Sequence, residues 1–166
     1  MKSIIVTGGL GFIGSNLIHK LLKKNYRVIN IDKINYASSF YNTREFAKSK
    51  NYKFYKININ DSKNIKKILK VFRPVGIFNL AAETHVDRSI DNPSEFINSN
   101  IMGVYNLLEC FRGYSKKYKN CKLIHISTDE VYGDVIKVEV KKMIPINLAH
   151  LMQLQKLHLI ILCILI

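Results

Sequence analysis

Residues 4–14 read IIVTGGLGFIG, a short apolar run followed at once by glycines at positions 8, 11 and 14. The run predicts a buried β-strand, and the helical spacing of the apolar residues after it predicts a helix over 12–24. Gly8 can supply the tight turn, Gly11 lets a pyrophosphate approach the backbone, and Gly14 permits close packing of helix on strand. Free N–H groups at the start of the helix attract phosphates. The stretch therefore predicts a dinucleotide-binding turn.

An acidic residue, Asp32, follows the last glycine of this turn by eighteen positions and ends the second predicted strand, 27–31. A carboxylate in that place can accept hydrogen bonds from a ribose 2′-hydroxyl, and it repels a 2′-phosphate. The pattern favours NAD over NADP, although the neighbouring Lys33 weakens that preference. The alternative is an ordinary glycine turn in which Asp32 caps a helix.

Strand-like and helix-like segments alternate along the rest of the chain. Further strands are predicted over 53–57, 75–79 and 122–126, with a helix after the N-cap Asp61 and a long helix opened by Pro93. Short apolar strands separated by helices predict a parallel sheet covered on both faces. The expected fold class is α/β, a doubly wound Rossmann sheet of five strands in the order 3-2-1-4-5. Its ligand should lie beyond the carboxyl ends of strands 1 and 4, where the winding switches direction.

Two polar segments follow predicted strands at this edge of the sheet. Residues 79–89, NLAAETHVDRS, begin with small side chains against which a cofactor could lie. Residues 125–133, HISTDEVYG, place Asp129 beside Glu130, which suits paired acid–base chemistry. Taken alone, His85 is more often a structural histidine, and an Asp-Glu pair in a loop is usually only solvated. Their position at strand ends favours the functional interpretation.

Together these segments resemble the dTDP-glucose 4,6-dehydratases, which are extended short-chain dehydrogenases. The resemblance covers roughly residues 1–134, where the family's blocks occur in order and spacing: TGGLGFIGSN, INIDKINYA, NLAAETHVDRSI, FINSNIMGVYNLLE and HISTDEVYGD. The discriminating block is STDEVYG, because sugar-nucleotide 4-epimerases of the same superfamily usually lack its Asp-Glu pair. A related epimerase or decarboxylase is the enzyme alternative.

The resemblance implies a lyase that uses bound NAD to convert dTDP-glucose to dTDP-4-keto-6-deoxyglucose. In that family NAD takes a hydride from sugar C4, water is eliminated across C5 and C6, and the hydride returns to C6. Asp129 would be the acid for the C6 hydroxyl, Glu130 the base at C5, and Thr128 the hydrogen-bond partner of the C4 hydroxyl. Thr84 would lie between cofactor and sugar. The residues implied around NAD are Gly8, Gly11, Phe12, Ile13, Gly14, Asp32, Lys33, Ile34, Asn35, Asn58, Ile59, Leu80, Ala81, Ala82, Thr84 and Ser99, with Asn58 standing where the family usually has an aspartate for the adenine amino group.

The resemblance ends near Asp134. The family continues with a proline-rich stretch and a Tyr-x-x-x-Lys pair that removes the proton of the C4 hydroxyl, whereas residues 135–166 contain no tyrosine. Reading residues 138–160 one base earlier, with permitted codons, recovers such a block, which predicts a frameshift near 136–137. The alternatives are a genuine amphipathic helix or a membrane anchor, and the apolar run 159–166 is far below the ~20 residues that span a bilayer.

The predicted organisation is therefore an NAD-binding domain over 1–134 and an aberrant tail over 135–166, without the family's C-terminal substrate domain. We expect the last strand to be left exposed and the stability to be marginal. The non-enzyme alternative is that the polypeptide is an inactive NAD-binding fragment.

Composition adds expectations about partners and compartment. The net charge is +14, but the lysines are scattered over helix faces and loops, which predicts a solvated surface rather than a nucleic-acid site. Cys110, Cys121 and Cys163 form no CxxC pair, which predicts a reducing cytoplasm, two buried thiols and no metal ligand. No secretory signal is recognised at the start, and no membrane partner is expected. The resemblance implies a dTDP-sugar substrate and a homodimer formed through helices of this domain.

Overall fold

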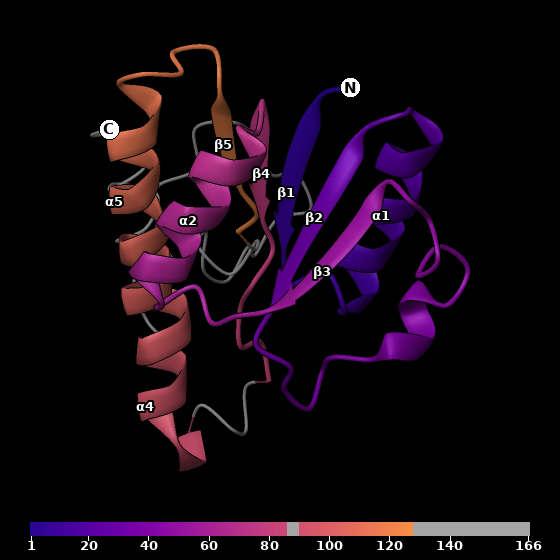
Figure 1. Ribbon diagram of the computed structural model, residues 1–166. Helices are drawn as coiled ribbons and strands as arrows, with labels where there is room; N and C mark the ends of the chain where they lie inside the picture. Colours follow the sequence, from indigo (N-terminus) through magenta and orange to yellow (C-terminus); the bar gives the residue numbers. More distant parts are fainter. Residues whose placement is uncertain (86–89, 128–166) are drawn as a thin grey trace, which may run out of the picture.

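The computed structural model describes residues 1–85 and 90–127, which fold around a parallel sheet of five strands (Figure 1). The strand order is β3-β2-β1-β4-β5, and every neighbouring pair is parallel. Both the predicted order and the predicted Rossmann-type class are therefore confirmed. The strands are β1 (Ser3–Thr7), β2 (Arg27–Asp32), β3 (Tyr52–Lys56), β4 (Gly76–Asn79) and β5 (Lys122–His125).

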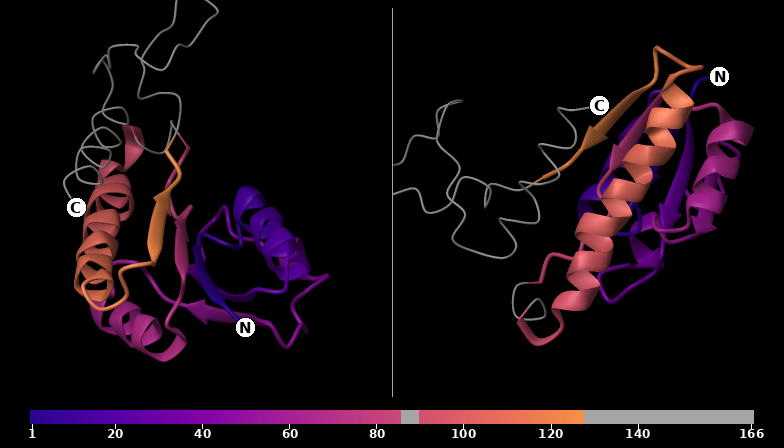
Figure 2. Two further views of the ribbon diagram at one scale, coloured as in Figure 1. Left: turned by 90° about the horizontal axis from the view of Figure 1, so that it is seen from above. Right: turned by 90° about the vertical axis from the view of Figure 1, so that its left-hand side faces the viewer.

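Helices cover both faces of this sheet (Figure 2). Helix α1 lies on one face, while α2 and α5 lie side by side on the other. None of the helices within residues 1–85 and 90–127 is long and apolar enough to cross a membrane. The helical elements are α1 (Phe12–Lys23), a 3-10 turn (Phe40–Thr43), α2 (Ser62–Phe72), α4 (Pro93–Phe96), a π-helical segment (Ile97–Met102) and α5 (Gly103–Ser115).

The first strand shows how the core is divided between the two faces. Successive side chains of a strand point to opposite faces, so β1 contributes to both layers. Ile5 packs in the layer under α2 and α5, whereas Ile4 and Val6 pack in the layer under α1. Every residue of β1 is buried. A strand covered on both faces needs a continuous apolar run, which is why IIV reads as strand without polar alternation.

The predicted N-cap of the second helix is confirmed. The carboxylate of Asp61 accepts a hydrogen bond from the backbone N–H of Asn64 at 3.0 Å. This bond holds the pKa of Asp61 below its ordinary value. Helix α2 ends at Arg73, whose φ of 44° is left-handed. The helix is thus bounded by local signals at both ends.

The helix opened by Pro93 departs from the prediction, because it is not α-helical throughout. Between α4 and α5 the backbone widens into a π-helical segment, and the N–H of Gly103 bonds to the carbonyl of Asn98 five residues earlier. Ser99 and Asn100 are both buried in this segment. Apolar periodicity alone does not reveal such a widening, which is often found at functional sites.

The end of the described chain agrees with two further expectations. In β5 and just after it, Ile124 and Ile126 keep 44% and 43% of their surface exposed at the sheet edge, as predicted for the last strand. Cys110 and Cys121 are buried free thiols, and burial raises the pKa of each. Cys163 and the predicted tail lie outside the described residues.

Tyr114 gives a pH-dependent test of the α5 layer. Its buried hydroxyl donates to the carbonyl of Pro74 at 3.0 Å, and burial raises the pKa of Tyr114 to about 12. We expect Tyr114→Phe to lower the free energy of unfolding by about 1 kcal/mol at neutral pH. Since the folded state favours the protonated phenol, this advantage is complete below pH ~10 and is lost as the pH rises toward 12.

Chemical denaturation of both proteins from pH 7 to pH 12 measures this difference. Tyr105→Phe, at an exposed tyrosine of the same helix, is the matched control and should leave stability unchanged. A Tyr114→Phe difference that stays constant up to pH 12 would contradict the assignment.

Candidate functional site

A cleft of about 450 Å³ opens beyond the carboxyl ends of the strands. It lies at the switch point between β1 and β4, where the sequence predicts the ligand. Of the residues implied around the cofactor, all except Ile34 lie on its wall. The wall is formed by Gly8, Gly11, Phe12, Ile13, Gly14, Ile31, Asp32, Lys33, Asn35, Ala37, Ser38, Ile57, Asn58, Ile59, Leu80, Ala81, Ala82, Thr84, Ser99, Ile126 and Ser127.

The glycine turn forms the floor of this cleft, and two of its glycines admit no side chain. Gly8 has a φ of 69°, and a Cβ on it would lie 2.8 Å from the backbone of Leu80. A Cβ on Gly14 would lie 2.3 Å from the carbonyl oxygen of Gly8. Gly8 thus forms the tight turn that the motif predicts, and Gly14 lets α1 pack closely on that turn, just beyond the end of β1.

Gly9 and Gly11 differ in the space around them: Gly9 packs against buried side chains, whereas Gly11 has open space above it. A Cβ on Gly9, which the sequence motif does not single out, would lie 2.1 Å from the Oδ1 of the buried Asn30. A Cβ on Gly11 would meet only the carbonyl oxygen of Gly8, at 3.3 Å. The protein therefore leaves the space over Gly11 open toward the cleft, as the predicted phosphate approach requires.

The first turn of α1 points into this space. Gly11 is its N-cap in an extended conformation, no side chain caps the turn, and no acidic residue lies in it. Phe12 and Ile13 are 80% and 64% exposed, so the turn is open to solvent. An uncapped helix N-terminus carries partial positive charge and suits an anion.

The carboxylate of Asp32 ties the glycine turn to the end of β2. Its Oδ2 accepts from the backbone N–H of Leu10 at 3.0 Å, and its Oδ1 accepts from the N–H of Ile34 at 2.9 Å. The hydroxyl of Ser38 lies 2.8 Å from Oδ1. Asp32 is buried and lies on the cleft wall, and its position is fixed by three protein donors, none of which belongs to a helix.

A chain of polar side chains joins the carboxyl ends of β1, β4 and β5. The Thr7 hydroxyl donates to Oδ1 of Asn79, whose Nδ2 lies 2.9 Å from Nδ1 of His125. The backbone N–H of Ala81 lies 3.3 Å from the Thr7 hydroxyl oxygen. Thr7 and Asn79 are fully buried. The chain holds the ends of three strands together behind the small residues of the cleft wall.

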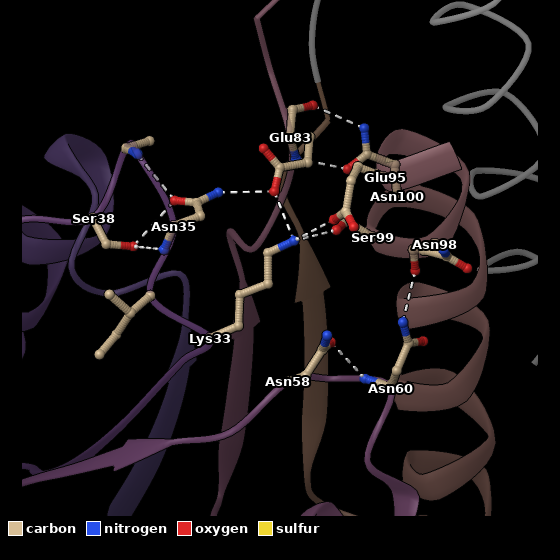
Figure 3. A network of polar contacts seen from close by, with 12 residues as sticks. Lys33, Asn35, Ser38, Asn58, Asn60, Glu83, Glu95, Asn98, Ser99 and Asn100 are labelled. Carbon is tan, nitrogen blue, oxygen red and sulfur yellow. Dashed lines mark hydrogen bonds and ion pairs between the residues drawn. The ribbon is translucent and has the colours of Figure 1, made fainter. Parts of the chain in front are cut away.

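A polar network closes one side of the cleft (Figure 3). The Lys33 ammonium lies 2.7 Å from Oε1 of Glu83, 2.8 Å from the Ser99 hydroxyl and 3.4 Å from Oε2 of Glu95. Burial opposes the charge on Lys33, but the Glu83 and Glu95 carboxylates outweigh it and raise the pKa of Lys33. The Asn35 amide also donates to Oε1 of Glu83, at 2.8 Å. Lys33 is therefore a charged, anchored part of the wall.

The backbone of Glu83 is held as firmly as its side chain. Its N–H donates to Oδ1 of Asn100, and the Asn100 amide donates back to its carbonyl, both at 2.8 Å. Asn100 and Ser99 are adjacent residues of the π-helical segment, and both face this network (Figure 3). The network thus joins the ends of β2 and β4 to the long helix.

Ile34 is the exception among the residues implied around the cofactor. Its φ of 62° is left-handed, a rare conformation for a β-branched residue. Ile34 lines a neighbouring cavity of about 480 Å³, which shares Lys33 and Asn35 with the cleft. The turn after Asp32 directs Ile34 to this adjoining cavity, and its contact with the cofactor stays a prediction.

The far end of the cleft is formed by the loop after β3. Oδ1 of Asn58 accepts from the N–H of Asn60 at 3.0 Å. A Cβ on Gly103 would lie 2.7 Å from the Ile59 side chain, so α5 packs closely on this loop. The sequence interpretation places Asn58 near the adenine and Ile59 in the NAD site, and the structure brings both to the wall.

Several wall residues were missed by the sequence interpretation: Ile31, Ala37, Ser38, Ile57, Ile126 and Ser127. Ile31, Ile57 and Ile126 read as ordinary strand residues, because strand ends line the cleft only after folding. Among residues 1–85 and 90–127, the buried hydroxyl of Ser127 finds no hydrogen-bond partner. Thr128, Asp129 and Glu130 come directly after it and lie outside the described residues. Within the described ranges, no three His, Cys, Asp or Glu residues are grouped to hold a metal ion.

Comparisons with known proteins agree with this geometry. Residues 5–147 match the family described as GDP-mannose 4,6 dehydratase. The dTDP-glucose 4,6-dehydratase of Neisseria meningitidis serogroup B is 41% identical over 141 residues, covering 81% of this chain and 40% of that protein. The crystal structure of dTDP-glucose 4,6-dehydratase from Bacillus anthracis in complex with NAD superposes with a TM-score of 0.82 at 32% identity, over 97% of this chain and 49% of that one. The crystal structure of UDP-glucose 4-epimerase from Thermotoga maritima with UDP-glucose superposes with a TM-score of 0.79 at 31% identity, over 95% of this chain and 48% of that one. The chain thus spans less than half the length of the curated relative.

Proposed function

Since the chain belongs to the GDP-mannose 4,6 dehydratase family, we propose that it is the NAD-binding part of a dTDP-glucose 4,6-dehydratase. In the complete reaction such an enzyme converts dTDP-glucose to dTDP-4-keto-6-deoxyglucose. The curated relatives at 40–45% identity carry that name, which supports the choice of reaction. The cleft at the switch point is the observation that carries the cofactor assignment.

The residues present fit a dinucleotide. The space over Gly11 and the uncapped first turn of α1 suit a pyrophosphate. Asp32 presents a carboxylate to a ribose, and Ala81 and Ala82 leave room for a flat ring against the end of β4. NAD, when bound, supplies the hydride acceptor and donor of the reaction.

The chain's own groups bind and orient in this proposal. Thr84 is exposed and lines the cleft, and we propose that it lies between the cofactor and the sugar. Asp129 and Glu130 are proposed as the acid and base of the elimination, with Thr128 as the hydrogen-bond partner of the sugar. Ser127 and Ile126, which precede them, already lie at the cleft, and this supports the placement.

A sugar-nucleotide 4-epimerase is the second candidate, favoured by a fold similarity of comparable size. Both reactions can share the cofactor cleft, so the fold does not separate them. The Asp129-Glu130 pair favours the dehydratase, because an elimination needs one group to remove a proton and another to protonate the leaving hydroxyl.

A third candidate is an inactive NAD-binding fragment, favoured by the absence of tyrosine from residues 135–166. We propose that these residues are the product of a frameshift near 136–137. The nucleotide sequence tests this directly, and an uninterrupted frame whose minus-one product lacks the Tyr-x-x-x-Lys block would contradict it.

Turnover and binding measurements on the 166-residue chain separate these candidates. With NAD and dTDP-glucose we expect saturable NAD binding by calorimetry and no keto-sugar chromophore, because the group that removes the C4 hydroxyl proton is missing. Robust keto-sugar formation would overturn the inactive-fragment view. Conversion of UDP-glucose to its 4-epimer would favour the epimerase. Absence of saturable NAD binding would contradict the cofactor assignment and leave only the fold assignment supported.

A further inference from the structure

We propose that Glu83 is a specificity-determining positioning residue, which holds the Lys33 ammonium away from the ribose 2′ position so that the cleft rejects NADP. The proposal rests on the proposed NAD function of the cleft. It answers a conflict in the sequence, where Asp32 disfavours a 2′-phosphate while the adjacent Lys33 could attract one. The structure offers a physical reason why the lysine does not compensate for the aspartate.

The Lys33 side chain ends at Glu83 and Ser99. Its ammonium meets Glu83 at 2.7 Å and Ser99 at 2.8 Å, toward the long helix (Figure 3). The carboxylate of Asp32 is held instead by Leu10 of the glycine turn and by Ser38. The two neighbouring side chains therefore have different partners.

Glu83 is held firmly in the protein. Its side chain is 6% exposed, against 60% for Glu95, the other carboxylate near the ammonium. Asn35 and Asn100 fix its carboxylate and its backbone. A carboxylate with these partners stays in place when a ligand binds, whereas Glu95 at 3.4 Å is free to move with solvent. Glu83 is thus the anchor of the lysine.

The charges on this wall determine whether a ribose 2′-phosphate is attracted or repelled. With Glu83 in place, the ammonium is neutralised locally and Asp32 dominates at the ribose. A 2′-phosphate brings about two negative charges to that point and finds no unpaired cation among the described residues of this wall. Without the Glu83 carboxylate, one negative charge is removed and a lysine four methylenes long becomes free to turn into the cleft, which it already lines.

The test is to measure NAD and NADP dissociation constants by calorimetry on the full chain and on Glu83→Gln. The isosteric amide keeps the backbone bonds to Asn100. We expect the NADP-to-NAD ratio of dissociation constants to fall about three- to fivefold, the size of one poorly screened charge pair. Adding Lys33→Met to Glu83→Gln should restore the ratio of the original chain. Glu109→Gln removes the same charge from a distant Glu–Arg pair and should leave the ratio unchanged.

The double variant Lys33→Met/Glu83→Gln removes both charges of the pair and leaves no unpaired carboxylate, so it keeps the proposal testable if Glu83→Gln does not fold. Because the paired lysine contributes nothing to NADP binding in the original chain, the double variant should bind NADP as the original chain does. Loss of NADP affinity in the double variant, or an unchanged ratio in a folded Glu83→Gln that binds NAD, would refute the proposal. If the original chain binds neither dinucleotide, the proposed function fails first, and this inference falls with it.

Discussion

Gly14→Ala is expected to unfold the domain or to lower its free energy of unfolding by about 3 kcal/mol, and to abolish NAD binding. The added methyl would lie 2.3 Å from the carbonyl oxygen of Gly8 and 2.8 Å from the Cα of Gly9. Both contacts are to backbone, so no side-chain rotation relieves them. Helix α1 would have to move away from β1, which opens the turn beneath the cleft. Thermal unfolding followed by circular dichroism measures the loss.

Gly113→Ala is the matched control, because Gly113 lies in α5 and, apart from its own helix backbone and chain neighbours, no described residue has an atom within 4 Å of an added Cβ. Alanine there should raise the stability by about 0.5–1 kcal/mol, since glycine in a helix interior is the more costly residue. If both substitutions had equal effects, the close packing of α1 on the turn would not be the reason for Gly14.

Asp32→Ala is expected to weaken NAD binding about 10- to 100-fold, the effect of losing hydrogen bonds to a charged acceptor. Two contributions add in this variant. The ribose loses its carboxylate, and the N–H groups of Leu10 and Ile34 lose their acceptor, which loosens the glycine turn. Calorimetric titration with NAD measures the first effect, and thermal unfolding without NAD measures the second.

Asp32→Asn separates the two contributions. The amide oxygen can still accept a hydrogen bond from the turn, so the stability should lie between those of the original chain and Asp32→Ala. The negative charge is gone, so discrimination against NADP should shrink. An Asp32→Ala variant that binds NAD as tightly as the original chain would show that the carboxylate does not face the ribose.

Much of the fold was predictable because parallel strands and the helices between them have local apolar patterns. The run IIV at 4–6 predicts a strand buried on both faces, and Asp61 marks the start of α2. The strand order follows from the handedness of crossovers and needs no side-chain detail. The π-helical segment 97–102 could not be predicted, because the apolar residues before it and after it each keep helical spacing.

The residues of the candidate site could be predicted where they are close together in the sequence. They could not be predicted where folding brings distant residues together. The glycine turn and Asp32 are such local patterns, whereas Ile57 and Ile126 reach the wall only because their strands end at one edge. The partnership of Lys33 with Glu83 joins residues fifty positions apart, and nothing in either segment predicts it. The left-handed turn at Ile34 likewise depends on the carboxylate that binds its N–H.

The π-helical segment has a consequence for the phase of the long helix. An α-helix advances by about 100° per residue, so a segment that accommodates one extra residue rotates the turns before it by about that angle relative to the turns after it. Ser99 and Asn100 can therefore face Lys33 and Glu83 while Val104 and Leu108 still face Ile59. Removing a single residue from 97–102 would restore an ordinary helix and turn one of these two faces away from its partners. The π-helical segment thus lets one helix direct its polar residues to the Lys33–Glu83 network and its apolar residues to Ile59, which an uninterrupted α-helix would not do at once.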